Sequence, residues 1–320
     1  MKKLNVGYLY IVLCALIFSF VEVALKATAG MFHPMQVTVL RFLVGGAVLL
    51  PVAFRVMKRR GARFTRQDAG FFALLGFLFV CVAMSFYQLA VVYAPAAVVA
   101  VLFSCNPIFI TVLAGLPLRE PVYKNDVLAL CVEALAVLII IDPVHARLNS
   151  LGVFFALLSA ALFALYSVLG KRRTARFGGA AVTSFCSLFG GAELLVLLLL
   201  GHTAAGRAFY GSLGLDLYAD VPILRTLTPA ALPWLFYLGA VNTGLGFVFH
   251  MLAMEKTSAQ TASLIFFLKP MLAPLFALLF LREELRPNMA LGILCFLVGS
   301  GVAVIPGILR ENRAKDAEAV

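Results

Sequence analysis

A few ionisable side chains lie inside long apolar stretches, where they could bind a ligand or exchange a proton. They are Glu22, Lys26, Arg41, Glu133 and Lys269. A charge inside a membrane-length apolar segment is costly, and it usually faces a protein interior or an aqueous cavity. Because carboxylates and cationic groups occur together, the set suits zwitterions or small organic anions better than bulky cations. These positions are the first candidates for a polar binding site.

Lys269 gives the sharpest signal, because it lies near the middle of its apolar stretch, where its ammonium cannot easily reach water. It precedes Pro270, and Asn106-Pro107 holds the matching place earlier in the chain. A proline removes a backbone donor and opens polar backbone at mid-membrane depth. We therefore expect Asn106, Pro107, Lys269 and Pro270 to contact substrate or a coupling proton. The alternative for Lys269 is a structural ion pair with Glu133.

Glu22 and Arg41 lie at matching depth in two consecutive apolar stretches, about 10 Å below the same boundary. The two stretches are joined by a short turn, so a direct Glu22–Arg41 pair is feasible. Lys26 lies one helical turn further out on the face of Glu22. The set could contact substrate, or it could be a permanent Glu22–Arg41–Lys26 network that neutralises buried charge. Lys26 alone could extend outward to the polar boundary.

Other polar residues carry weaker signals. Glu133 is near mid-depth and has no counterpart in the matching half, whereas Asn242 begins an Asn-Thr-Gly-Leu-Gly stretch that is a weak point for a helix and could contact ligand. Glu193 is shallower, and His250 is most simply a hydrogen-bonded or solvated residue. No metal-ligand spacing, phosphate-binding glycine loop or nucleophile beside a base occurs. We expect no enzyme activity, no metal and no cofactor.

The composition requires membrane-spanning elements to position these residues. Hydrophobic residues make up 63% of the 320 positions and charged residues 13%, with a mean hydropathy of +1.02. A soluble chain is about half apolar and about a quarter charged. Continuous apolar runs favour helices over a barrel. The predicted class is an all-α polytopic membrane protein with ten transmembrane helices, at residues 7–28, 34–56, 68–90, 95–116, 124–142, 150–170, 179–200, 230–253, 259–281 and 289–308.

The chain contains an internal repeat. Residues 90–143 match residues 253–306 at a constant shift of 163. The coincidences include Phe103/Phe266, Pro107/Pro270, Leu118-Arg119-Glu120/Leu281-Arg282-Glu283 and Asn125/Asn288. Five helices per copy is an odd number, so residues 1–143 and 150–308 should be inverted repeats that can rock about a shared site. This pattern predicts a carrier that works by alternating access, followed by a cytoplasmic tail at 309–320.

The basic residues fix the expected orientation. Most of the 26 Lys and Arg fall on one side of the predicted bundle, in clusters around residues 2–3, 55–66, 171–176 and 310–315. Lys and Arg in short loops mark the cytoplasmic side, so both termini should be cytoplasmic. The net charge of +11 is therefore a topology signal and no sign of nucleic-acid binding. The long connection at 201–229 is either a lid or, more simply, an insertion.

The ordered set of segments resembles the EamA type of the drug/metabolite transporter (DMT) superfamily. The resemblance lies in FSFVEVALKATAG, HPMQVTVLRFLVGGAVLLP with Arg41, LAVVYAPAAVVAVLFSCNPIFITVLAGLPLREP and SAQTASLIFFLKPMLAPLFALLFLREEL. The chain departs from that family where it has Lys269 in place of a frequent glutamate and Phe18-Ser19 in place of a tryptophan-glycine. The resemblance implies two five-helix repeats around a central cavity lined by the first, third, fourth, sixth, eighth and ninth helices.

The resemblance also implies export or exchange of small metabolites, often amino acids, in a bacterial cytoplasmic (inner) membrane. We therefore expect an exporter of amino acids or related zwitterions and organic anions. The alternatives are a proton-coupled multidrug or cationic amine exporter that uses Glu22, and a receptor or assembly subunit without transport. Expected partners are a small-molecule substrate, the lipid bilayer and, in a coupled carrier, a proton, with the protein a monomer or a homodimer.

Overall fold

The computed structural model describes residues 6–115, 124–141, 149–224, 227–284, 286–299 and 301–302. Within these ranges every regular element is a helix, apart from one isolated bridge between Ala29 and Phe32. Among the described residues, seven helices are long and apolar enough to cross a membrane, and Val127–Ile140, Ile265–Leu281 and Pro287–Gly299 are shorter apolar helices. The all-helical membrane class predicted from the composition is confirmed.

The first half of the chain supplies α1 (Val6–Ser19), α2 (Val21–Ala27), α3 (Pro34–Arg59), α4 (Arg66–Gly76), η1 (Phe77–Met84), α5 (Ser85–Tyr93), α6 (Ala96–Phe103), α7 (Asn106–Gly115) and α8 (Lys124–Ile141). The second half supplies α9 (Ser150–Phe177), α10 (Gly179–Leu200), α11 (Ala204–Ser212), η2 (Asp216–Tyr218), α12 (Leu232–Phe236), η3 (Tyr237–Gly246), α13 (Phe247–Lys256), α14 (Ala259–Ala262), α15 (Ile265–Phe276) and η4 (Ala277–Leu281). The helix Pro287–Gly299 follows.

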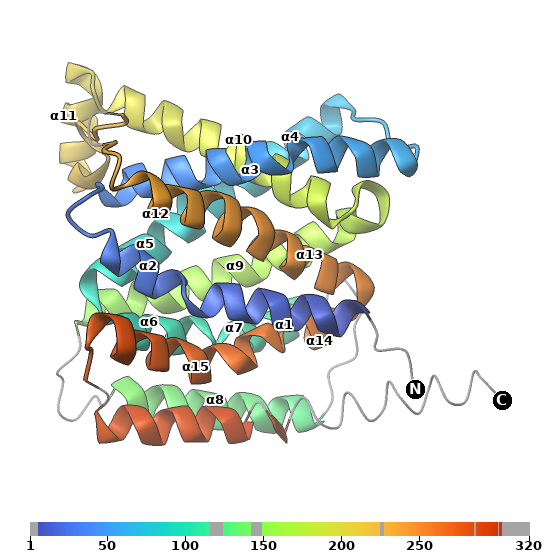
Figure 1. Ribbon diagram of the computed structural model, residues 1–320, viewed down its shortest axis with the longest axis vertical. Helices are drawn as coiled ribbons and strands as arrows, with labels where there is room; N and C mark the ends of the chain where they lie inside the picture. Colours follow the sequence, from blue (N-terminus) through green and yellow to red (C-terminus); the bar gives the residue numbers. More distant parts are fainter. Residues whose placement is uncertain are drawn as a thin grey trace.

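These helices lie side by side in one bundle with two distinct ends (Figure 1). The α11 end, at the left of the view, carries α11, the turn before α3 and the start of α6. The other end, which we call the Arg60 end, carries the α3–α4 turn, the α9–α10 turn and the start of α14. The matching helices α6 and α14 therefore begin at opposite ends of the bundle. Helices of the two halves interleave, because α3 packs on α10 and η3, α5 on α9, and α1 on α13 and α15.

Local sequence signals explain where α3 begins and how closely it packs. The His33 side chain accepts a hydrogen bond from the Met35 N–H at 3.3 Å, and the Gln36 side chain accepts one from the His33 N–H at 3.1 Å. This reciprocal cap satisfies donors that a helix start leaves free. Further along, a side chain at Gly45 would meet the Gly239 carbonyl oxygen at 2.7 Å. Glycine there lets α3 approach η3 closely.

The helix breaks differ in part from those the prolines predict. The first break separates α6 from α7 directly before Asn106-Pro107. The second separates α14 from α15 between Ala262 and Ile265, whereas Pro270 lies inside the continuous helix α15. Membrane helices tolerate such a proline, because neighbouring groups satisfy the freed carbonyl. The expected break at Pro270 is therefore displaced toward the Arg60 end.

In the part of the chain that the structure describes, three stretches of wider π-helix interrupt the spans, at η1, η3 and η4. Such stretches are common at functional sites. The η3 stretch contains Asn242 and covers the Asn-Thr-Gly-Leu-Gly segment that the sequence marks as a weak point. It faces α3, which carries Arg41.

Candidate functional site

The interior of the bundle holds a buried ion pair between Lys269 on α15 and Glu22 on α2. The Lys269 ammonium contacts Glu22 Oε1, and each side chain is 1% exposed. The Tyr87 hydroxyl on α5 donates a hydrogen bond to the same Oε1 at 2.6 Å. The two charged residues come from opposite halves of the chain. Burying such a pair costs desolvation free energy. Its presence therefore favours a role beyond packing.

Aromatic rings surround the Lys269 ammonium. Its nitrogen lies 4.8 Å from the Phe103 ring centroid and 5.6 Å from the Tyr87 ring centroid. Phe103 packs in turn against Phe163 and Phe266, with centroids 5.5 and 6.0 Å apart. Cation–π contacts compensate part of the hydration that a buried ammonium loses. The site is thus a charged pair inside an aromatic shell.

Arg41 on α3 is fully buried near this pair and forms no ion pair of its own among the described residues. Its guanidinium carbon lies 4.7 Å from the Phe42 ring, and the side chain is 1% exposed. Nε and Nη2 have no hydrogen-bond partner among the residues that the structure describes. Glu22 and Tyr87 lie close enough to interact with Arg41 electrostatically. Glu22 Oε2 is likewise buried without a partner in the described part of the chain.

The pairing differs from the Glu22–Arg41 pair that the sequence suggested. Glu22 pairs with Lys269, and no direct Glu22–Arg41 ion pair forms within the described ranges. Glu133 lies on α8, but its side chain is outside the described residues, so its role stays a prediction. Two charges at equal depth can still contact different neighbours, because depth does not determine how each helix is rotated about its axis.

Lys26 lies outside the central cluster. It lines a pocket of about 500 Å³ at the α11 end, together with Tyr93, Pro95 and Glu283. Glu283 is also its electrostatic neighbour. Lys26 therefore extends away from the Glu22–Lys269 pair toward this end of the bundle.

The two expected asparagines lie deep in the bundle. Asn106 Nδ2 donates to the Ala160 carbonyl at 2.7 Å and so ties the start of α7 to α9, while its Oδ1 has no partner in the described ranges. Asn242 is 1% exposed, and its Nδ2 has no partner there either. Pro107 adjoins Asn106 at the break, and Pro270 is buried next to Lys269.

Sequence reasoning missed Tyr87, Phe103 and the partner of His250. His250 is fully buried, and its Nε2 lies 2.9 Å from the Ser167 hydroxyl. It is thus a hydrogen-bonded residue, as the simplest reading predicts. Tyr87 gave no signal because one tyrosine in an apolar helix resembles any aromatic packing residue.

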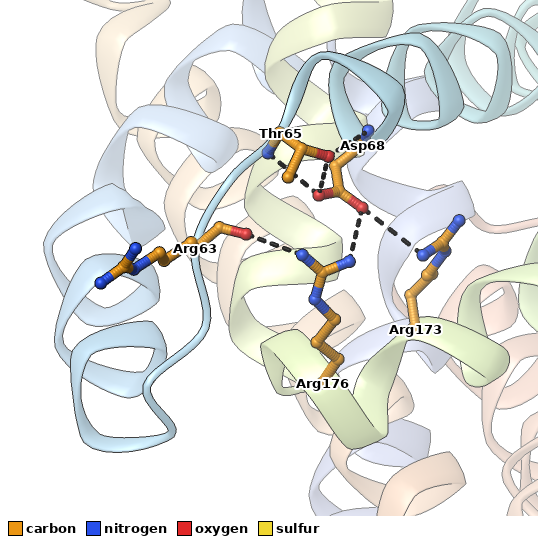
Figure 2. A network of polar contacts seen from close by, with 5 residues as sticks. All are labelled: Arg63, Thr65, Asp68, Arg173 and Arg176. Atoms are coloured by element: carbon orange, nitrogen blue, oxygen red, sulfur yellow. Dashed lines mark hydrogen bonds and ion pairs between the residues drawn. The ribbon is translucent and has the colours of Figure 1, made fainter.

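At the Arg60 end, polar contacts tie the α3–α4 turn to α9 (Figure 2). Asp68 accepts from Arg176 at 3.0 Å and Arg173 at 3.4 Å, and it caps α4 through Thr65. Arg176 also donates to the Arg63 carbonyl at 2.8 Å. These bonds join the first half of the chain to the second.

A second link at the Arg60 end runs through Arg60 itself. Arg60 donates to Glu255 Oε1 at 2.5 Å and to the Thr174 carbonyl at 2.7 Å. Glu255 Oε2 accepts the Gly179 N–H at 2.8 Å. The α3–α4 turn, the α9–α10 turn and α13 are therefore held together by one carboxylate and one guanidinium.

A carboxylate also joins the two halves at the α11 end. Glu283 accepts the backbone N–H groups of Ala96 at 2.9 Å and Ala97 at 3.1 Å, at the first turn of α6. Arg282 adopts a left-handed backbone conformation, with φ of 56°, directly before it. A carboxylate at a helix start satisfies free donors and interacts favourably with the helix dipole. We call this contact the Glu283 cap.

The EamA-like transporter family model matches residues 5–142 and again residues 150–305, so it covers most of the chain in two copies. The chain belongs to this family. It is therefore a membrane transporter of the DMT superfamily, as its sequence segments suggested. The family is one of transporters.

Individual relatives agree with this assignment. A protein of Clostridium kluyveri named as an uncharacterized transporter is 33% identical over 308 residues, which is 94% of this chain and 92% of that one. An uncharacterized transporter of Archaeoglobus fulgidus is 25% identical over 88% of this chain and 92% of its own length. Protein PecM of Dickeya dadantii is 26% identical over 75% of this chain and 73% of its own length.

A solved crystal structure has the same fold. It superposes with a TM-score of 0.67 at 18% sequence identity, over 93% of this chain and 97% of that one. At that identity the likeness concerns the arrangement of helices alone.

Proposed function

We propose that this transporter exports small metabolites, namely amino acids or related zwitterions and organic anions, across the cytoplasmic membrane by alternating access. The observation that carries the proposal is the buried Glu22–Lys269 pair, which Tyr87 braces and Arg41 adjoins. The two halves of the chain contribute one charge each. A site between two halves is where a carrier needs its substrate contacts.

The proposed architecture is ten helices in two inverted five-helix repeats, residues 1–143 and 150–308, with a cytoplasmic tail at 309–320. The double family match supports these bounds. So does the constant shift between the two copies, together with the start of α6 and α14 at opposite ends of the bundle (Figure 1). The tail lies outside the described residues.

Alternating access needs two ends that close in turn. The Glu283 cap joins the halves at the α11 end, and the Arg60–Glu255 link joins them at the Arg60 end. Each contact consists of hydrogen bonds to a carboxylate, which can break without disrupting a core. We propose that, during the transport cycle, one of these contacts breaks while the other stays formed.

The orientation follows from the basic residues. Arg60, Arg63, Arg173 and Arg176 gather at the Arg60 end. Cationic loops mark the cytoplasmic side, so we place this end and both termini in the cytoplasm. The relative in Clostridium kluyveri supports a bacterial cytoplasmic membrane.

The charges of the cluster favour an anionic or zwitterionic substrate. Glu22 is already paired with Lys269, and Arg41 adds a further positive charge. A site with this balance attracts a carboxylate and repels a simple cation. The alternative of a cationic amine exporter that exchanges protons at Glu22 therefore receives less support.

Exchange across liposomes tests the proposal. Purified protein in liposomes preloaded with a mixture of amino acids should take up radiolabelled amino acids in exchange, and Lys269→Ala should lower the initial rate at least about tenfold, because Glu22 loses its partner. Lys58→Ala, at an exposed position of α3, should keep the wild-type rate. Equal rates for Lys269→Ala and wild type would contradict the role of the pair. No flux with any solute would indicate a receptor or assembly subunit.

A further inference from the structure

One edge of the Arg41 guanidinium has no partner among the described residues, and its geometry suits a carboxylate. Nε and Nη2 are the two donors on one side of the guanidinium, and both are buried without a partner among the described residues. These two parallel N–H groups form the fork that binds a carboxylate with two hydrogen bonds. A buried cation without a counterion is strongly unfavourable. The position therefore calls for an anionic group during the working cycle.

Glu22 offers the complementary half of the same site. Its Oε1 is used by Lys269 and Tyr87, and its Oε2 is buried without a partner in the described part of the chain. A carboxylate oxygen accepts N–H donors and has no donor of its own. Arg41 and Glu22 interact electrostatically, so the free donors and the free acceptor belong to one neighbourhood.

The flanking side chains restrict where a ligand can dock. The Phe42 ring lies 4.7 Å from the guanidinium carbon of Arg41, and the Phe103 ring lies 4.8 Å from the Lys269 ammonium. Lys269 already has Glu22 as its partner. Arg41 is thus the cation that can meet a ligand carboxylate without first breaking an ion pair.

We infer that Arg41 binds the carboxylate of the substrate through its Nε/Nη2 edge and that Glu22 Oε2 accepts a hydrogen bond from the substrate ammonium. The substrate class is an amino acid, which carries both groups close together. This inference rests on the proposed transport function and adds which residue meets which group. It assigns the carboxylate contact to Arg41, while Lys269 stays paired with Glu22.

The experiment compares three probes that differ in one group each. Leucine carries both groups, 4-methylpentanoate lacks the ammonium, and 3-methylbutylamine lacks the carboxylate. Binding to purified protein is measured by thermal shift, and exchange is measured in liposomes. Ligands stabilise the folded state in proportion to its occupancy. Wild type should bind leucine most tightly, 4-methylpentanoate less tightly and the amine least.

Arg41→Lys keeps the charge and removes the fork, so it should weaken leucine and 4-methylpentanoate about 10- to 100-fold, the range typical of lost charged hydrogen bonds. It should leave the amine unchanged. Glu22→Gln should weaken leucine more than 4-methylpentanoate. Arg55→Lys is the matched control, because Arg55 lies on the same helix α3 at an exposed position. It should behave as wild type.

The outcomes separate the inference from the proposed function. If Arg41→Lys binds and exchanges leucine as wild type does, the carboxylate contact is wrong while transport stands. If wild type prefers the amine, both the contact and the zwitterionic substrate class are wrong. If nothing moves in liposomes, the transport function fails first. Should Arg41→Lys not be recovered in folded form, the three probes on wild type and on Glu22→Gln test the inference, and an equal loss of leucine and 4-methylpentanoate binding in Glu22→Gln would contradict it.

Discussion

One oxygen of Glu22 accepts both the Lys269 ammonium and the Tyr87 hydroxyl, so three helices depend on a single carboxylate. In the interior each of these groups would be costly if left alone, because little water is available to replace a lost partner. The residues are therefore coupled, and changes at Glu22 and Lys269 should not add.

A double-mutant cycle measures this coupling. Lys269→Met alone should destabilise the protein by about 3–5 kcal/mol, since it leaves the Glu22 carboxylate buried and unpaired. Combining it with Glu22→Gln should recover most of that loss, because no isolated charge remains. The measurement is thermal unfolding of the purified single and double variants. Losses that simply add would show that the two side chains act independently.

At the scale of helices, hydrogen bonds at the helix ends hold the two halves of the chain together. The Glu283 cap bonds the first turn of α6, whose donors have no partner inside the helix. The pocket of about 500 Å³ lies beside it and includes Val98, which is fully buried. Loss of the cap should loosen α6 from η4 and open this end.

Glu283→Ala tests the cap with a cysteine placed at Val98. A membrane-impermeant maleimide should label Val98→Cys several-fold faster in the Glu283→Ala background, at least about threefold if the cap contributes ~1 kcal/mol. Glu284→Ala, at an exposed neighbouring position, is the control and should leave the rate unchanged. Unchanged labelling in Glu283→Ala would show that the cap does not close this end.

At the scale of the whole molecule, a substitution that opens one end of the bundle should favour closure of the other end. A carrier that alternates between two closed ends balances the contacts at one end against those at the other. The Arg60 end is tied by Arg60–Glu255 and by the Asp68 network (Figure 2). Weakening that end should therefore favour closure of the α11 end.

Arg60→Ala provides the opposite perturbation. It removes the bonds to Glu255 and Thr174, so maleimide labelling of Val98→Cys should slow relative to the unmodified background. Arg59→Ala, an exposed neighbour on α3, should have no effect. Faster labelling in Arg60→Ala would contradict reciprocal closure and indicate a general loss of packing.

The sequence by itself determined the class of protein and much of its helical layout. The expected span 179–200 coincides with α10, and the span 34–56 matches α3 except for its last turn. Helix positions are readable because the bilayer demands long apolar runs, and turns interrupt them. Depth within a span follows from counting, so the sequence also placed Glu22, Arg41 and Lys269 among the buried charges.

Only the tertiary structure decided which of these charges meet. Pairing depends on how each helix is rotated and on how closely its neighbours approach, and neither follows from depth along one axis. Close glycine contacts such as Gly45 with Gly239 set that approach. In the structure Lys269 pairs with Glu22, the Nε/Nη2 edge of Arg41 has no partner among the described residues, Lys26 lines the pocket at the α11 end, and Tyr87 donates to Glu22. Hydrophobic spacing fixes where a chain crosses the membrane, whereas side-chain packing fixes the chemistry at its centre.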